Sequence, residues 1–194
     1  MNSSIQIVEK PDWVSWEEIK HCLEDAHSVN RDKGINMSHY HWPKEKIIDF
    51  LGNKGVMLVA LESKRVIGTA AIADKVGKAW YAKGNYAYMC FASILPQYQK
   101  QGIYSNLLRT REELAKKMGY RIFMMDTHAR NRIIQKNAQK NGYRRVRYFL
   151  TRDKDHFSVI LVKWIEGFPF SKYYCWMKYR KSKIRAIVTK MVSL

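Results

Sequence analysis

The sequence has few cysteines and no long apolar run. Three cysteines, Cys22, Cys90 and Cys175, stand far apart in 194 residues, which fits neither a disulfide framework nor a Cys-x-x-Cys metal site. No segment approaches the roughly 18 consecutive apolar residues that a membrane-spanning helix needs. The first residues, MNSSIQIVEK, lack the basic start and apolar centre of a secretion signal. We therefore expect a cytoplasmic protein with reduced thiols and no bound metal.

Acidic residues are also scarce, 17 against 35 basic ones, so the formal net charge is +18. A field of that sign attracts nucleic acid, an anionic membrane surface or an acidic small molecule, without selecting among them. Hydrophobic residues make up 46% of the chain, which excludes a disordered protein. The length suits one sizeable domain with a short appendage.

Apolar periodicity predicts a mixed α/β (α+β) domain. A capping box, Ser15-x-x-Glu18, opens a helix at 15–29, and Pro43 opens a second one whose Ile47, Ile48 and Leu51 face inward. The remaining expected elements are strands at 56–61, 66–73, 86–95, 121–127, 143–150 and 157–165, and helices at 103–118 and 131–141. This order predicts a mostly antiparallel twisted sheet flanked by helices, with one parallel strand–helix–strand crossover.

One helix start lacks a side-chain cap. The stretch PQYQKQGIYSNLL, from Pro96 to Leu108, joins a strand to a helix without an acid or a Ser/Thr cap at the junction. Unpaired amides and the positive end of the helix dipole can bind an external anion. Gly102 permits close backbone approach and Lys100 adds charge. The stretch predicts a phosphate or pyrophosphate site, and an ordinary turn completed by solvent is the alternative.

The amino-acid sequence of this stretch resembles a known motif. ILPQYQKQGIYSNLL is similar to the phosphate-binding motif of the GNAT acyltransferase superfamily, between the fourth strand and third helix. The matching residues are Ile94, Pro96, Tyr98, Gln99, Gly102 and Ile103. The sequence departs from the family at Tyr104, where Gly or Ala is usual. The ring either narrows the site or points away from it.

A second patch strengthens the resemblance. Asn131, Gly142 and Tyr143 reproduce the ends of a further family pattern, and Ala138 stands where many members keep a catalytic Tyr. The resemblance covers 55–164 in element order. It implies a GNAT-like fold with a splayed central parallel strand pair.

The resemblance implies acetyl-CoA as cosubstrate and no metal. The pyrophosphate would bind the amides of Gln101 to Ser105, while the pantetheine arm would follow the fourth strand. The cofactor-binding residues that the resemblance implies are Ser93, Ile94, Gln99, Lys100, Gln101, Gly102, Tyr104, Ser105 and Asn131. Backbone amides of that strand would polarise the thioester carbonyl.

The sequence identifies the residues that transfer protons less specifically than it identifies the phosphate-binding loop. An amine acceptor with a pKa near ~10.4 must lose a proton at neutral pH, whereas the leaving thiol, near ~8.5, needs less help. His128 is our choice for the catalytic base; His39, Tyr40 and His41 are alternatives. Cys90 is a weaker candidate as a nucleophile, because no His adjoins it.

The C-terminal segment is basic and aromatic. We expect a GNAT-like domain at 1–166 and an extension at 167–194 that forms a docked helix. Its apolar face comprises Ile184, Ile187, Val188, Met191 and Val192. The alternatives are binding to RNA or to an anionic membrane, and packing against a second subunit in a homodimer.

These features together predict an acetyltransferase. The chain would transfer an acetyl group from acetyl-CoA to an amine or hydroxyl of a small-molecule, glycan or nucleotide-sugar-like acceptor. An acidic acceptor would suit the net charge. The alternative is a non-catalytic, basic GNAT-fold module that binds RNA or an anionic membrane surface.

Overall fold

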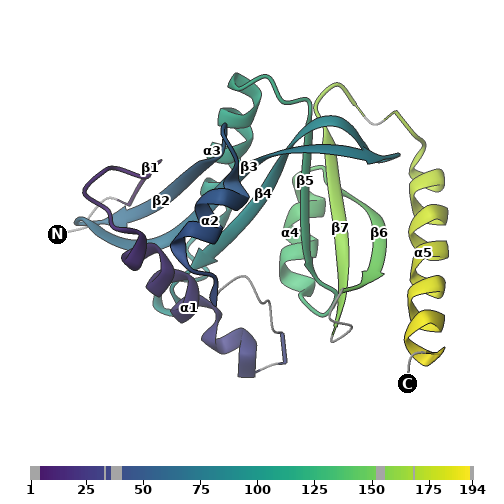
Figure 1. The fold of residues 1–194 in the computed structure, drawn as a ribbon, viewed down its shortest axis with the longest axis horizontal. Helices are drawn as coiled ribbons and strands as arrows, with labels where there is room; N and C mark the ends of the chain where they lie inside the picture. The colour runs from purple at the N-terminus through teal and green to yellow at the C-terminus, as the bar shows by residue number, and fades with distance from the viewer. Residues whose placement is uncertain (1–4, 33, 36–40, 152–155, 168, 193–194) are drawn as a thin grey trace. The chain divides into compact units, whose positions relative to one another are not determined.

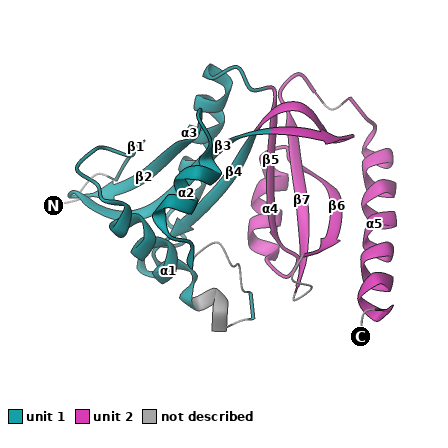
Figure 2. Cartoon of the chain, in the orientation of Figure 1, with its two compact units in different colours: residues 1–75, 87–120 teal, residues 76–86, 121–194 magenta. Residues whose placement is uncertain are grey.

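The structure is a computed structural model that describes residues 5–32, 34–35, 41–151, 156–167 and 169–192. Figure 1 shows the helices and strands in chain order. The chain forms two compact units (Figure 2): unit 1 comprises 1–75 and 87–120, and unit 2 comprises 76–86 and 121–194.

Unit 1 is a sheet with helices packed on it. Its elements are β1 (Gln6–Glu9), α1 (Trp16–Asp32), α2 (Lys44–Leu51), β2 (Val56–Glu62), most of β3 (Arg65–Ala79), the end of β4 (Ala82–Ile94), the 3₁₀ turn η2 (Pro96–Tyr98) and α3 (Ile103–Lys117). The strands lie in the order β1-β2-β3-β4, and β2 pairs antiparallel with both β1 and β3. Apolar residues of all three helices join one core with the strands.

Local sequence signals explain two features of unit 1. The predicted capping box forms at α1, since the Glu18 amide donates to Ser15 Oγ at 3.1 Å and the Ser15 amide donates to the Glu18 carboxylate at 2.8 Å. The β2–β3 hairpin turns at Ser63 and Lys64, whose φ angles of 47° and 70° give a type I′ turn. The strands expected at 56–61 and 66–73 therefore pair as an antiparallel hairpin.

One expectation about unit 1 was wrong, and one of its strands was not predicted. Ile47 and Leu51 of α2 are buried as expected, but Ile48 is 46% exposed. Adjacent helix positions differ by about 100°, so the short helix buries only the i and i+4 positions. Strand β1 was not predicted, because four residues are too few for a strand periodicity to stand out.

Unit 2 carries a three-stranded antiparallel sheet. Its elements are the hairpin end of β3 and β4, β5 (Ile122–His128), α4 (Arg132–Lys140), β6 (Arg144–Leu150), β7 (Phe157–Trp164) and α5 (Lys172–Val192). The strands β5, β7 and β6 lie in that order, and both pairs are antiparallel. At the hairpin end, a Cβ on Gly77 would lie 2.2 Å from the Ala82 carbonyl oxygen, so the close approach of the strands requires glycine.

Helix α5 lies along β6. The Tyr148 amide of β6 donates to Ser182 Oγ at 2.9 Å, and Cys175 and Ala186 are the buried residues of the helix. Within the described ranges, no helix combines the length and apolarity needed to cross a bilayer. The predicted fold class, a mixed α/β domain with mostly antiparallel strands, is confirmed.

Candidate functional site

The start of α3 has the open geometry that the sequence predicts. Gly102 is the N-cap residue, with φ 80° and ψ −5°, and no side chain caps the helix. The first turn holds no acidic residue. The Asn106 amide donates to the Gly102 carbonyl at 3.1 Å, so the amides of Ile103, Tyr104 and Ser105 precede the regular helical ladder. The helix therefore presents donors and a positive dipole end to an anion.

The space directly beside Gly102 is open. A Cβ built on Gly102 would meet no described atom within 4 Å. Gln99, Lys100, Gln101 and Ser105 are all exposed, and Lys100 takes a left-handed φ of 65°. A diphosphate fits this arrangement, because backbone donors, a lysine and free volume occur together.

Side chains of the same segment hold the loop in place. Gln99 Nε2 donates to the Ile94 carbonyl at 3.1 Å, and Gln101 Nε2 donates to the Gln97 carbonyl at 3.2 Å. The Tyr98 hydroxyl donates to the Glu62 carboxylate at 2.5 Å, and this bond raises the pKa of Tyr98. The side chains of Gln99 and Gln101 thus stabilise the loop conformation, and the main-chain amides of the loop are the groups that could bind a ligand.

Tyr104 is directed into unit 1. Its ring packs against the core, and its hydroxyl lies at the guanidinium of Arg111. Burial raises the pKa of Tyr104, while the charge of Arg111 opposes the increase. Of the two orientations considered for this ring, the structure has the one that leaves the helix start open.

Strand β4 is distorted where it approaches this loop. Phe91 has a φ of 49°, which is rare for a bulky residue. Thr69 Oγ1 donates to the Phe91 carbonyl at 2.8 Å, and Arg111 donates to the carbonyls of Cys90 at 3.2 Å and Ala71 at 3.5 Å. Side chains thus hold carbonyl groups at the distortion.

The predicted pantetheine residues of β4 have buried side chains. Ser93 lies 2.7 Å from Thr69 Oγ1 and also hydrogen-bonds Cys22. Burial raises the pKa of Cys22 to about 12. Ile94 packs over Gly68. Ser93 and Ile94 can therefore serve a ligand only through the main chain.

Unit 2 holds the other predicted residues. His128, at the end of β5, is buried; its Nδ1 accepts the Arg130 amide at 3.1 Å, and its ring stacks on His156 at 4.8 Å. A neutral ring in this state carries its proton on Nε2. Asn131 is the N-cap of α4, since Oδ1 accepts the Ile134 amide at 3.3 Å.

The structure also places Ala138 and His41. Ala138 is fully buried, so the usual tyrosine position here is a packing position of α4. His41 is exposed and lies 4.0 Å from Glu24. His39 and Tyr40 fall outside the described residues. In the described part of the chain, no three His, Cys, Asp or Glu side chains gather in a way that would hold a metal ion.

Sequence reasoning missed Arg111, Thr69 and the Phe91 distortion. Arg111 is 1% exposed. Its position four residues after Leu107 and four before Ala115 places it on the buried stripe of α3, and that spacing was an available signal. The hydroxyl of Thr69 and the φ of Phe91 depend on distant partners and left no sequence signal.

One family model matches most of the chain. The model of the acetyltransferase (GNAT) family matches residues 16–143. No curated protein matches the sequence.

Several solved structures have a similar fold. The ribosomal-protein-S18-alanine N-acetyltransferase of Escherichia coli is 15% identical, with 87% of this chain and 99% of that chain covered and a TM-score of 0.62. A GNAT family acetyltransferase from Elizabethkingia anophelis with acetyl-CoA bound is 15% identical, with 85% and 100% covered and a TM-score of 0.59. A GNAT family acetyltransferase from Staphylococcus aureus Mu50 is 13% identical, with 84% and 99% covered and a TM-score of 0.65. At these identities the likeness concerns the fold.

Proposed function

Because the chain belongs to the GNAT acetyltransferase family, we propose that it transfers an acetyl group from acetyl-CoA to an amine or hydroxyl group of an acceptor. The observation that carries this proposal is the uncapped start of α3 at Gly102, with open space beside it. Acetyl-CoA would supply an activated thioester and a diphosphate that matches exposed amides.

The residues of unit 1 have binding and orienting roles in this proposal. The amides from Gln101 to Ser105 bind the diphosphate, and Lys100 adds a positive charge. Gln99 keeps the loop attached to the end of β4 through its bond to Ile94. These contacts hold parts of acetyl-CoA that do not react, so they contribute mainly to its affinity and little to the rate of acetyl transfer.

The distorted part of β4 has the orienting role. Thr69 donates a hydrogen bond to the Phe91 carbonyl, and Arg111 donates one to the Cys90 carbonyl. Such anchoring fixes the peptide planes on which the amides of the strand also lie, and fixed amides are effective donors to a polarised carbonyl. The proposal therefore uses main-chain donors of β4 for the thioester carbonyl.

In this proposal His128 transfers the proton, as the catalytic base. Asn131 contacts the pantetheine arm, as the family resemblance implies. For His128 to accept a proton at Nε2, its neutral ring must carry hydrogen on Nδ1, and the Arg130 amide must lose its present acceptor. The base role thus requires a rearrangement at Arg130. The acceptor is proposed to be a small, acidic molecule, in keeping with the net charge of +18.

A thermal-shift experiment tests the binding step. Acetyl-CoA at a hundredfold excess over Kd should stabilise the protein by about 2.7 kcal/mol. Pantetheine, which lacks the diphosphate, is the matched control and should give a much smaller shift. Equal shifts would contradict the role of the α3 start, and no shift with acetyl-CoA would contradict the function.

A second assay tests the chemistry. Release of CoA is measured with amines, amino sugars and peptides, and an acceptor-dependent rate is expected for one of these classes. Absence of both a thermal shift and turnover, together with tight and salt-sensitive RNA binding, would identify the non-catalytic basic module instead.

A further inference from the structure

Helix α5 exposes apolar side chains along one side, which we call the apolar stripe; Arg180 and Lys181 interrupt it between Met177 and Ile184. The exposed large hydrophobic residues of the helix are Tyr173, Trp176, Met177, Ile184, Ile187, Val188, Met191 and Val192. Ile184 is 64% exposed and Met191 71%. An exposed set of this size on one element is unusual, since a soluble surface normally carries single, scattered apolar side chains.

The stripe lies opposite the docked side of the helix. Tyr173, Met177, Ile184 and Met191 follow one another at spacings of four and seven residues, which places them in one row. Ser182, which accepts a hydrogen bond from β6, is about half a turn from Ile184. The apolar face predicted from the sequence exists, but it is turned away from β6.

Cations lie on both sides of the stripe and, at Arg180 and Lys181, within it. The basic residues of α5 are Lys172, Lys178, Arg180, Lys181, Lys183, Arg185 and Lys190, and the helix has no acidic residue. At its start, Tyr173 stacks on Trp176 at 5.9 Å, and the Arg180 guanidinium lies 5.3 Å from the Trp176 ring. Aromatic and basic residues beside an apolar row are typical of helices that lie in a membrane interface.

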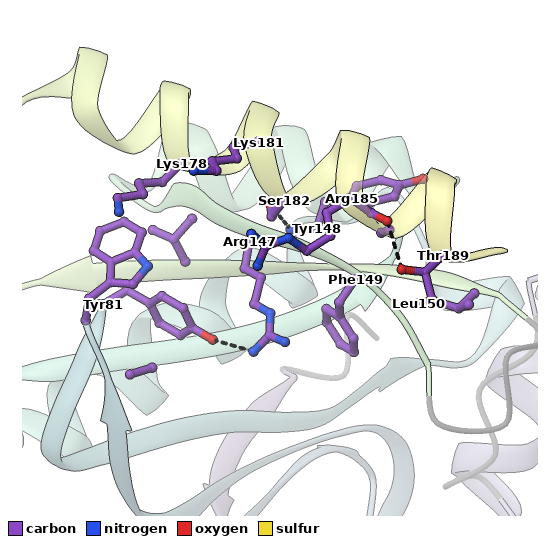
Figure 3. Close-up of a pocket in the computed structure, with 14 residues that line it drawn as sticks. Tyr81, Arg147, Tyr148, Phe149, Leu150, Lys178, Lys181, Ser182, Arg185 and Thr189 are labelled. Carbon is purple, nitrogen blue, oxygen red and sulfur yellow. Dashed lines mark hydrogen bonds between the residues drawn. The ribbon is translucent and has the colours of Figure 1, made fainter. Parts of the chain in front are cut away.

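A basic cleft adjoins one flank of the stripe. It has a volume of about 520 Å3, and β6, the β3–β4 hairpin end and α5 line it. Figure 3 shows Arg147 reaching between Tyr81 and Phe149; it donates to the Tyr81 hydroxyl at 3.4 Å. Lys178, Lys181 and Arg185 line the cleft from α5.

The chemistry of this cleft suits a phosphate. Within the described part of the chain, the charged residues that line it are all cationic: Arg147, Lys178, Lys181 and Arg185. Lys181 and Arg185 lie on the side of α5 next to Met177 and Val188, by helical spacing. A group bound in the cleft would thus carry its negative charge beside the apolar stripe.

Charge decides which partner fits the stripe. Packing of α5 against α5 of a second copy would bring two rows of cations together with no acid to offset them. RNA would neutralise the cations but would leave Ile184, Val188 and Met191 in water. An anionic bilayer surface satisfies both features, because phosphates meet the cations and acyl chains meet the stripe.

We propose that α5 binds in the plane of an anionic phospholipid bilayer, with its apolar stripe toward the acyl chains and a lipid phosphate in the basic cleft. The helix lies on the membrane without crossing it, because its basic residues leave no apolar stretch that could span a bilayer. Such binding places the protein at a lipid surface, and it is independent of acetyl transfer.

Vesicle co-sedimentation of the full chain tests the stripe. The protein should sediment with vesicles of mixed phosphatidylglycerol and phosphatidylcholine, and much less with phosphatidylcholine alone. The double variant Ile184→Glu, Val188→Glu should lose binding by more than about tenfold, because two charges replace apolar groups that the bilayer would bury. Val76→Glu with Ile133→Glu, at exposed positions of unit 2 outside α5, is the matched control and should bind normally.

A second pair of variants tests the cleft. The double variant Lys181→Gln, Arg185→Gln should bind anionic vesicles about tenfold more weakly than the wild type. The control is the double variant Lys83→Gln, Lys140→Gln, which removes the same amount of charge elsewhere in unit 2 and should weaken binding less. Inorganic phosphate serves as the soluble probe. If it stabilises the wild type while vesicles do not bind, the site takes a free anion and the lipid proposal is overturned.

The other outcomes are equally decisive. Circular dichroism and urea unfolding must show that each variant is folded, as expected for exposed positions. Sedimentation that is unaffected by the stripe variant would mean that charge alone drives binding, and would refute the proposal. A wild-type dimer that dissociates in the stripe variant, without vesicle binding, would assign the stripe to a second copy. Preferential binding to RNA would refute the proposal as well.

Discussion

The guanidinium of Arg111, on α3, donates a hydrogen bond of 3.2 Å to the carbonyl of Cys90 in β4. Arg111 is 1% exposed and also meets the Ala71 carbonyl and the Tyr104 hydroxyl. One buried cation therefore ties the helix that begins at Gly102 to the distorted strand.

Replacement of Arg111 by Met should destabilise the protein by about 3 kcal/mol, because buried carbonyls lose their donor. Urea unfolding measures the loss. Arg109→Met is the control: Arg109 lies on the exposed side of the same helix, and its loss should cost no more than about 0.5 kcal/mol. Equal stability of the two variants would show that the Arg111 contacts contribute little.

Gly102→Glu should weaken acetyl-CoA binding by at least about thirtyfold, since a carboxylate at the helix start repels the diphosphate. Gly102→Ala is the control. Like the Glu variant, it is destabilised by about 1 kcal/mol because a residue with a Cβ must adopt the positive φ of Gly102, but it adds no charge. Isothermal titration compares their affinities. A similar loss in both would attribute the effect to the backbone and contradict the anion site.

His128→Ala should lower kcat by about a hundredfold and leave the KM for acetyl-CoA unchanged, if His128 transfers a proton. His41→Ala is the control, since His41 is exposed near Glu24. Steady-state CoA release at several pH values gives both parameters. An unchanged kcat with reduced thermal stability would assign His128 to the support of the Arg130 amide alone.

Asn131 combines a structural role with a proposed binding role. Asn131→Ala should cost about 1 kcal/mol, because the Ile134 amide loses its cap, whereas Asn131→Asp should keep the cap. If the side chain also contacts the pantetheine arm, both variants should bind acetyl-CoA more weakly. Normal affinity in Asn131→Asp would restrict the residue to capping.

Tyr120 should make stability fall at alkaline pH. Burial, together with the 2.6 Å bond to the Asp74 carboxylate, raises the pKa of Tyr120. The unfolded chain loses this proton above about pH 10 while the folded protein keeps it, so the stabilisation is present below pH ~10 and is lost as the pH rises toward the folded pKa.

Tyr120→Phe should accordingly be less stable by about 2 kcal/mol near neutral pH, and its unfolding free energy should decline less steeply at alkaline pH. Urea unfolding at about pH 8 and about pH 11 measures the difference, against Tyr173→Phe at an exposed site. Parallel declines in the two variants would exclude Tyr120 as a source of the pH dependence.

The sequence by itself determined the local structure of several helix starts and turns. The capping box at Ser15, the hairpin at Ser63 and Lys64, and the uncapped helix start at Gly102 all depend on residues within a few positions of one another. Backbone conformation and capping act over that range, so one stretch of sequence contains the whole signal.

Only the tertiary structure decided which apolar and polar faces are covered. The inward turn of Tyr104, the burial of Arg111, the exposure of Ile48 and the outward stripe of α5 each depend on elements far away in the chain. A helical periodicity defines a face but not its partner. The partner is set by which surfaces can exclude water together, and that is a property of the folded chain.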